Sequence, residues 1–383
     1  MKLRKLAALG TCAAMVLSLA ACGGSSTATT TAAAAPAETT AAAAAETTAA
    51  AAETTAAAAE TTAAAAEAPA ADFSGTTLVF ASDAVGSGSY NQIVEMSKVL
   101  ENEGGFGLVD VQPISPGGMG APYLFADGAV DLAFLNAAPA KWATEEGTLD
   151  KGPTSGYSAI AGGLSAVCYI NCISNKFLSD HGVSTIEEIF EKKLPLRIGC
   201  SAVGSMDAEG AYLLLDYFGV TQEDLESWGG SITNQSGSEN EAALQDGKID
   251  FYIDHTSSSS STMAEIATTC DVTFLQWGDD LIDWFVNEKG FQRVPVPAGS
   301  FKGQDNELIL PGSPDSLFCR SDLDEETVYQ ITKVLSENRD ALVGIYSSLS
   351  PWDVETCMDA EKLGGNALHP GAERYYKEMG YIK

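Results

Sequence analysis

The chain has 383 residues and carries 52 acidic side chains against 21 basic ones, which gives a formal net charge of −31 at pH 7. Proteins that bind nucleic acid need a basic surface for the phosphates, so this composition excludes that class of partner. The length is too great for one simple hydrophobic core, and we expect two domains within residues 73–383.

Residues 1–21 have the pattern of an export signal. Three basic residues among the first five precede an apolar run over residues 6–19, which is too short to span a membrane. The run ends in Leu19-Ala20-Ala21-Cys22-Gly23, which resembles the lipobox of bacterial lipoproteins and implies cleavage before Cys22 and acylation of its sulfur. An ordinary secretory signal with a chance cysteine is the alternative. We expect an exported protein, lipid-anchored through Cys22 to the outer face of the cytoplasmic membrane or located in the periplasm.

Residues 22–72 follow as a low-complexity segment that is mostly Ala, Thr and Glu. Glu-Thr-Thr recurs with a period near seven, but no Leu, Ile or Val is present to form the seam of a coiled coil. The composition predicts a disordered tether behind the lipidated cysteine. A glycosylated stalk is the alternative.

From residue 73 the pattern alternates strands, loops and helices, which indicates an α/β fold. The loop Ala84–Tyr90 follows an apolar run and precedes an amphipathic helix, and a similar loop, Ala202–Ser205, recurs 118 residues later. Gly/Ser loops at helix N-termini offer backbone N–H groups to an anion. Turn geometry and helix capping are the alternative roles for such residues.

Two further segments repeat in the same order. Gln235–Ser238 is the counterpart of the loop at 116–119, and Asp246–His255 matches Asp127–Asn136 at an offset of 119. The repeat predicts two α/β lobes with a ligand cleft between them, while two generic α/β units with similar turns are the alternative. We expect lobe 1 over 73–168, lobe 2 over 169–298, and a return to lobe 1 with C-terminal helices over 299–383. The predicted crossings lie at 166–173 and near 295–303.

Ligands of open α/β sheets bind beyond the carboxyl ends of the strands, where the repeated loops lie. The candidate ligand-binding residues are therefore those at these strand ends, together with the start of the serine tract after His255. They are Ser87, Gly88, Ser89, Tyr90, Gly117, Gly118, Asn136, Ser201, Ser205, Met206, Asp254, His255, Thr256 and Ser257.

Signals for catalysis are weak. The sequence contains no P-loop lysine, G-x-S-x-G elbow or H-E-x-x-H motif, and its cysteines and histidines lack metal-ligand spacing. An exported hydrolase that uses Asp254, His255 and a serine is the enzymatic alternative, but adjacent residues on a strand point to opposite faces. His369 is expected to cap the helix that follows it. We expect no enzyme activity and no cofactor, and we expect the six cysteines after residue 72 to be mostly free and buried, with one or two long-range disulfides left open.

Several motifs together resemble the TAXI-type solute receptors of TRAP (tripartite, ATP-independent) transporters over most of 76–380. They are Gly86–Tyr90, Asp127–Leu132, Gly204-Ser205, Asp246–Asp250, Pro297–Asp305 and Leu368–Tyr376. The resemblance implies a type II periplasmic-binding-protein fold that closes on a small solute and delivers it to a membrane permease. It further implies an acidic solute, such as glutamate or a 2-oxo acid. Two segments depart from the family pattern: Gly117-Gly118-Met119 replaces Gly-Gly-Ser, and Asn136-Ala137-Ala138 replaces Gln-Ser-Asp.

The sequence thus predicts a monomeric, membrane-tethered, extracytoplasmic receptor that captures a small carboxylated solute, either an amino acid such as glutamate or a 2-oxo or dicarboxylic acid, for a TRAP-type permease. A binding protein of an ABC importer, a sensor and a purely structural surface protein are the further alternatives. Arg197, Arg293 or Arg320 would strengthen the prediction of a carboxylate ligand if any of them reached the cleft.

Overall fold

A computed structural model describes residues 71–83, 85–115 and 118–383, which belong to one compact unit spanning Glu67–Lys383. The predicted signal, residues 22–70 of the predicted tether with Cys22, and Gly117 lie outside the described residues. Within the described part of the chain, no helix combines the length and the apolar character needed to cross a membrane.

The first sheet of the described chain has five strands in the order β2-β1-β3-β12-β4. β1 runs parallel to β2 and β3, and β12 runs antiparallel to β3 and β4. These strands are β1 (Thr77–Ala81), β2 (Leu108–Gln112), β3 (Leu132–Asn136), β4 (Tyr157–Ala161) and β12 (Asp315–Arg320). The helices around this sheet are α1 (Gly88–Asn102), α2 (Ala121–Ala126), α3 (Ala137–Glu145), α11 (Glu325–Glu337), α12 (Arg339–Ile345) and α13 (Pro370–Glu378), with two short 3₁₀ turns at Ser347–Leu349 and Ala360–Leu363.

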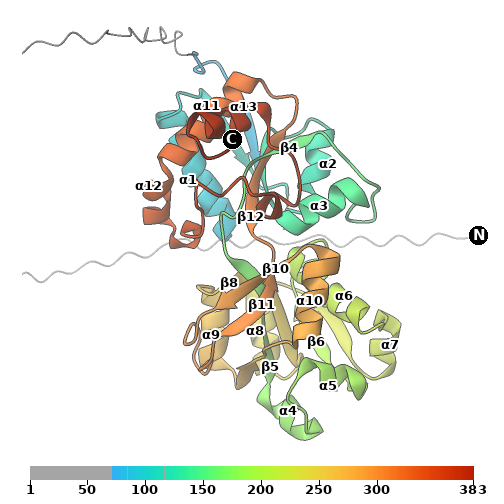
Figure 1. Ribbon diagram of the computed structural model, residues 1–383. Helices are drawn as coiled ribbons and strands as arrows, with labels where there is room; N and C mark the ends of the chain where they lie inside the picture. The colour runs from blue at the N-terminus through green and yellow to red at the C-terminus, as the bar shows by residue number, and fades with distance from the viewer. Residues whose placement is uncertain (1–70, 84, 116–117) are drawn as a thin grey trace, which may run out of the picture. The chain divides into compact units, whose positions relative to one another are not determined.

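The first sheet is covered on both faces, and strand alternation assigns each side chain to a face. Leu132 and Phe134 of β3 pack into the core formed with α1, α11 and α13, whereas Ala133 and Leu135 pack into the core formed with α2 and α3. Figure 1 shows α1, α11 and α12 on one side of this sheet and α2 and α3 on the other. Because all five residues of β3 are buried, the strand reads as a continuous apolar run that ends in Asn136.

The second sheet has the order β10-β11-β5-β8-β6-β7, with β9 paired to β5, among the residues described. Its strands are β5 (Val167–Ser174), β6 (Arg197–Cys200), β7 (Ser231–Asn234), β8 (Phe251–Ser257), β9 (Val272–Phe274), β10 (Gln292–Val296) and β11 (Leu308–Gly312). The helices around it are α4 (Asn175–His181), α5 (Ile186–Glu191), α6 (Met206–Tyr217), α7 (Gln222–Ser227), α8 (Gly237–Gln245), α9 (Ser261–Thr269) and α10 (Asp279–Lys289).

The two sheets repeat one topology. Strands β7-β6-β8-β5-β11 have the same order and directions as β2-β1-β3-β12-β4. An equivalent hydrogen bond recurs in each: the Val79 N–H donates to Asp131 at 2.8 Å, and the Arg197 N–H donates to Asp250 at 3.2 Å. These pairs are offset by 118 and 119 residues, so the sequence repeat corresponds to a structural one.

The chain crosses between the sheets twice, and both crossings differ from the predicted positions. The first lies between Ala161 and Val167, because β5 pairs with β8 of the second sheet from Val167 to Ile173. The second lies between Gly312 and Asp315, later than the predicted return near 295–303. The reason is that β10 and β11 form a hairpin, and Gly312 pairs with Cys168 of β5 so closely that a side chain there would meet the Val167 carbonyl.

The structure also bears on the predictions for His369 and for the cysteines. His369 is the N-cap of α13, where its side chain accepts a hydrogen bond from the Gly371 N–H at 3.2 Å, as predicted. The six cysteines of the described chain are free thiols, and all but Cys270 are buried.

Candidate functional site

A cavity of about 850 Å³ lies where loops at the carboxyl ends of strands from both sheets come together. From the first sheet it is lined by the β1–α1 loop, the end of β3 and the start of β12. From the second sheet it is lined by the β6–α6 loop, the start of α8, β8 and the serine tract after it. This is the position at which an open α/β sheet binds ligands.

Four helices of the described chain begin at the cavity with a serine as the N-cap: α1, α6, α8 and α9, capped by Ser87, Ser205, Ser236 and Ser260. The Ser87 hydroxyl oxygen accepts the Tyr90 N–H of α1 at 3.1 Å, and the Ser205 oxygen accepts the Ala208 N–H of α6 at 3.2 Å. Ser236 does the same for Glu239 of α8 in a reciprocal capping box. Capping uses the oxygens of Ser87 and Ser205 as acceptors, so their hydroxyl hydrogens can still donate to a ligand, whereas the Ser236 hydroxyl donates to the Glu239 carboxylate at 2.7 Å. The matched serines of the two loops therefore have the same local role in both sheets.

The predicted site residues fall into three groups. Tyr90 is not among the residues that line the cavity, because the lining face of α1 carries Ser89, Gln92 and Ile93 at helical spacing and Tyr90 lies beside it. Gly117 is outside the described residues. The others line the cavity together: Ser87, Gly88, Ser89, Gly118, Asn136, Ser201, Ser205, Met206, Asp254, His255, Thr256 and Ser257.

The sequence reasoning missed several polar residues of the lining. Gln92 could have been found from its helical spacing to Ser89, and Asp207 from its place directly after Met206 in the second loop. Ser165, Asp315 and Ser348 carry no local signal, because tertiary contacts alone bring them to the cavity. The missed residues also include Asp83, Ser115 and Thr262.

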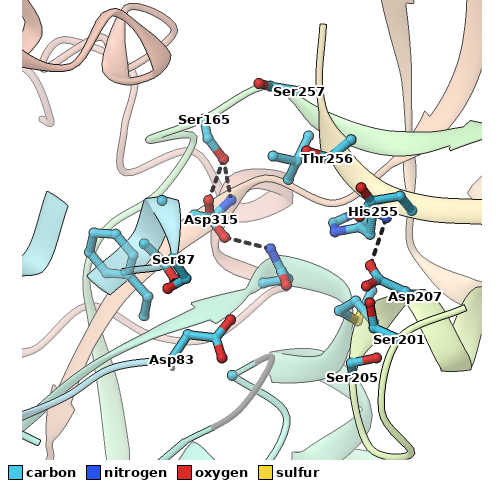
Figure 2. A pocket seen from close by; sticks show the side chains of 18 of the residues that line it. Asp83, Ser87, Ser165, Ser201, Ser205, Asp207, His255, Thr256, Ser257 and Asp315 are labelled. Carbon is cyan, nitrogen blue, oxygen red and sulfur yellow. Dashed lines mark hydrogen bonds between the residues drawn. The ribbon is translucent and has the colours of Figure 1, made fainter. Parts of the chain in front are cut away.

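Asp207 and Asp254 form a carboxyl pair on the second-sheet side of the cavity. Asp207 accepts the His255 N–H at 2.7 Å, a bond drawn in Figure 2. Burial raises the pKa of Asp254 well above its usual range, and the charge of Asp207 and a hydrogen bond with it act in the same direction. Burial likewise raises the pKa of Asp207. Each of the two carboxyl groups therefore holds its proton to a higher pH than a solvated aspartate does.

His255 is held as a neutral side chain. Burial lowers its pKa to about 3, and its Nε2 accepts the Ser313 N–H at 3.3 Å. Its ring packs edge-on against Tyr169, with 5.0 Å between the ring centroids. With its Nε2 lone pair occupied by a backbone N–H, His255 lacks the free acceptor that a general base needs.

Asp315 lies on the first-sheet side, within a network of polar side chains. It accepts hydrogen bonds from the Ser165 hydroxyl at 2.6 Å and from Asn136 Nδ2 at 2.8 Å (Figure 2). Its own N–H donates to the Ser165 oxygen at 3.1 Å. Burial raises the pKa of Asp315, and the hydrogen bonds from Ser165 and Asn136 oppose that shift.

No Lys or Arg is among the described residues that line the cavity. Arg197 binds both oxygens of Asp250, at 2.8 and 2.6 Å, and Arg293 binds the exposed Asp279 and Asp283. Arg320 pairs in the same way with Asp131 and Asp322. The three arginines named as candidates thus pair with carboxylates away from the cavity.

Metal chemistry has no evident centre in the part of the chain that the structure describes. No group of three or more His, Cys, Asp or Glu side chains there has the arrangement needed to hold an ion. The carboxyl pair and Asp315 are instead held by hydrogen bonds from Ser, Asn and backbone groups.

The fold and the cavity define the class of protein: a mixed α/β chain with two sheets of repeated topology and a cavity at the carboxyl ends of their strands. The family model described as the NMT1-like family matches residues 80–380, and the chain belongs to that family. This match does not test the narrower resemblance to TAXI-type receptors, which stays a prediction.

Several solved structures are similar to this chain at low identity. A Xanthomonas citri protein bound to ATP is 12% identical with a TM-score of 0.45, and the match covers 79% of this chain and 95% of that one. MatC from Rhodopseudomonas palustris with bound malate is 13% identical with a TM-score of 0.43, covering 79% and 96%. A binding protein component of an ABC phosphonate transporter from Pseudomonas aeruginosa is 13% identical with a TM-score of 0.42, covering 72% and 79%.

Proposed function

We propose that this protein is an extracytoplasmic solute-binding receptor that captures a small solute in the cavity by closure of its two lobes. The observation that carries the proposal is the cavity of about 850 Å³, which both sheets line through matched, serine-capped helix starts. This volume is in the range of small-molecule sites in proteins. Membership of the NMT1-like family supports the same role.

In this proposal Cys22 anchors the receptor to the lipid bilayer, and residues 23–72 let the receptor reach a membrane permease. The motifs shared with TAXI-type receptors favour a TRAP permease over an ABC importer or a sensor. The receptor acts as a monomer. Co-purification of the acylated chain with membrane proteins from its own cells would identify the permease, and recovery of an ATPase subunit would favour the ABC importer.

In this proposal the solute carries a carboxylate group, which binds at the N-termini of α1 and α6. The first-turn N–H groups of α1 and α6 and the hydroxyls of Ser87 and Ser205 can donate to an anion there. Because the described lining also holds four aspartates and no Lys or Arg, an amino acid such as glutamate suits it better than a 2-oxo or dicarboxylic acid. An ammonium group offsets the negative charge that a simple diacid would increase.

Closure of the lobes requires only that the solute bind the closed state more tightly than the open one. A difference of about 5 kcal/mol moves such an equilibrium from almost fully open to almost fully closed. Charge-assisted hydrogen bonds of about 1.5–3 kcal/mol each supply that difference with two or three contacts.

The proposal is tested by thermal shift and calorimetry on the full chain with amino acids, 2-oxo acids and dicarboxylates. The variant Ala202→Trp fills the cavity from an exposed loop position and should abolish solute binding. Its matched control, Ala264→Trp, changes an exposed residue of α9 that does not line the cavity and should leave binding intact. Binding that survives Ala202→Trp, or no binding by any solute, contradicts the proposal.

The hydrolase alternative makes a different prediction. It requires turnover of esters or peptides that is lost in His255→Ala. The occupied Nε2 of His255 and the opposite directions of neighbouring residues on β8 argue against it.

A further inference from the structure

The second crossing between the two lobes is short and has little freedom of its own. Only Ser313 and Pro314 lie between β11 and β12, whereas the first crossing is longer and includes Gly162 and Gly163. Proline fixes its own φ angle and restricts the residue before it to extended conformations. The contacts that Ser313 makes therefore set the angle at which one lobe leaves the other.

The first lobe holds Ser313 through the start of α3. The Ser313 Oγ accepts the Ala138 N–H at 2.8 Å, and the Ser313 carbonyl accepts Asn136 Nδ2 at 3.0 Å. The Pro314 carbonyl accepts the Ala137 N–H at 3.1 Å. Because the side chain of the N-cap residue Asn136 does not cap α3, the crossing supplies the acceptors that the first turn of this helix needs.

The second lobe holds the same residue through His255. The Ser313 N–H donates to His255 Nε2 at 3.3 Å, and the ring of His255 is fixed edge-on against Tyr169 of β5. Burial lowers the pKa of His255 to about 3, so the ring is neutral and Nε2 keeps the lone pair that accepts this N–H. Ser313 is fully buried, and each of its three polar groups has a partner: the N–H in the second lobe, the carbonyl and the hydroxyl oxygen in the first.

The two side chains that hold Ser313 are counterparts in the repeat. Asn136 of β3 and His255 of β8 are offset by 119 residues and occupy equivalent places on equivalent strands. Both also line the cavity. A solute that packs against either wall therefore acts on a side chain that is bonded to the crossing.

We propose that Asn136 and His255 are positioning residues for lobe closure, which hold Ser313 from opposite lobes and so set the angle between the lobes. The inference rests on the proposed receptor function and adds this role to it. Each hydrogen bond stabilises the arrangement of the lobes in this structure relative to other arrangements. Loss of one bond changes the population of this arrangement by about two- to tenfold, the range for a single hydrogen bond.

The test measures the separation of the lobes by single-molecule fluorescence resonance energy transfer on the full chain in detergent. Dyes on unnatural amino acids at Asp340 of the first lobe and Lys176 of the second, both exposed, avoid the native thiols. His255→Leu removes the acceptor of the Ser313 N–H and should change the solute-free population of the parent arrangement by the factor above. His255→Gln keeps an acceptor and should restore the parent distribution.

A second variant tests the first-lobe side of the crossing. Ser313→Ala removes the acceptor of the Ala138 N–H and should also shift the solute-free distribution. Ser316→Ala is the matched control, because Ser316 is equally buried and its hydroxyl donates to the Lys362 carbonyl at 2.6 Å within the first lobe. This control should lose stability and keep the parent distribution of lobe separations.

The outcomes separate this inference from the receptor function. A parent-like lobe separation in either folded variant, His255→Leu or Ser313→Ala, overturns the inference and leaves the receptor function standing. The inference also fails if His255→Gln behaves as His255→Leu does, or if Ser316→Ala shifts the lobes as far as Ser313→Ala. If no amino acid, 2-oxo acid or dicarboxylate changes the lobe separation of the parent, both proposals are contradicted.

Discussion

Asp207 accepts a hydrogen bond of 2.7 Å from the backbone N–H of His255, which ties the first turn of α6 to β8. Helix α6 follows the second Gly/Ser loop, and β8 is the counterpart of β3 in the repeat. The bond holds the Asp207 carboxyl beside that of Asp254. This hydrogen bond therefore positions the start of α6 and places the Asp207 carboxyl group in the cavity wall.

The carboxyl pair predicts that Asp254→Asn stabilises the protein at neutral and alkaline pH. The folded pKa of Asp254 is raised above its ordinary value of 3.8, so the folded state binds more protons than the unfolded state above that pH and stability falls as pH rises. Asparagine resembles the protonated acid and can keep hydrogen bonds to Asp207 and Tyr252. We expect a gain of about 1–3 kcal/mol at pH 8 that disappears near pH 4.

Urea denaturation of both proteins between pH 4 and pH 8 measures this gain. Asp340→Asn, at an exposed position, should show no such dependence on pH. A variant that is less stable than the parent at every pH would show that the pKa of Asp254 is not raised in the folded protein.

His255 predicts a pH dependence of the opposite sign. Burial depresses its pKa from 6.5 to about 3, so the unfolded state binds more protons between these values and stability falls as pH drops through that window. His255→Gln keeps an acceptor for the Ser313 N–H and removes the titration. Below about pH 6 the parent should lose about 1.4 kcal/mol per pH unit more than the variant. Denaturation curves of the two proteins that shift in parallel from pH 7 to pH 4.5 would contradict the expected burial of a neutral imidazole.

Arg197 is expected to stabilise the fold without affecting solute binding. Asp250 is buried, with 6% of its surface exposed. In Arg197→Ala its carboxylate keeps the hydrogen bond from the backbone N–H of residue 197 but loses both hydrogen bonds from the guanidinium group. Loss of such a contact costs about 2 kcal/mol. Solute affinity should not change, because neither residue lines the cavity.

Arg293→Ala is the control for this prediction, since Arg293 pairs with exposed aspartates and should matter little to stability. Chemical denaturation measures the stability of both variants, and calorimetry with the best-binding solute measures their affinity. Equal stability of the two variants would show that the Asp250 contact contributes no more than an exposed ion pair.

Gly210 in α6 is required for close packing against Tyr169. A Cβ at position 210 would overlap the buried ring of Tyr169, which lies within a cluster of aromatic side chains. We expect Gly210→Ala to destabilise the protein by about 1–3 kcal/mol, despite the better helix propensity of alanine. Gly344→Ala, in a helix where the new Cβ meets no atom, should instead stabilise by up to about 1 kcal/mol. Thermal unfolding measures both, and a stabilised Gly210→Ala variant would mean that Tyr169 can move aside.

Much of this fold could be predicted from local sequence patterns. The runs Thr77–Ala81 and Arg197–Cys200 are strands, the Gly/Ser loops after them are capped by Ser87 and Ser205, and His369 begins the last helix. These features depend on residues within a few positions of each other, where hydrophobic period and capping chemistry act. The repeat at 118 to 119 residues then predicted two equivalent sheets.

The charge of the site depended on contacts between distant residues. Gln92 meets Ser348 across 256 positions, and Asn136 meets Asp315 across 179, and neither pair has a sequence signal. The position of the second crossing was missed for the same reason, since only the pairing of Gly312 with Cys168 keeps the β10–β11 hairpin in the second sheet.

The sequence alone therefore determined the two repeated α/β units and the serine-capped loops at their strand ends, because periodicity and capping are local. Tertiary structure alone decided that Arg197, Arg293 and Arg320 pair with carboxylates away from the cavity while four aspartates line it. Charge–charge interactions act through space, and the fold decides which residues share that space.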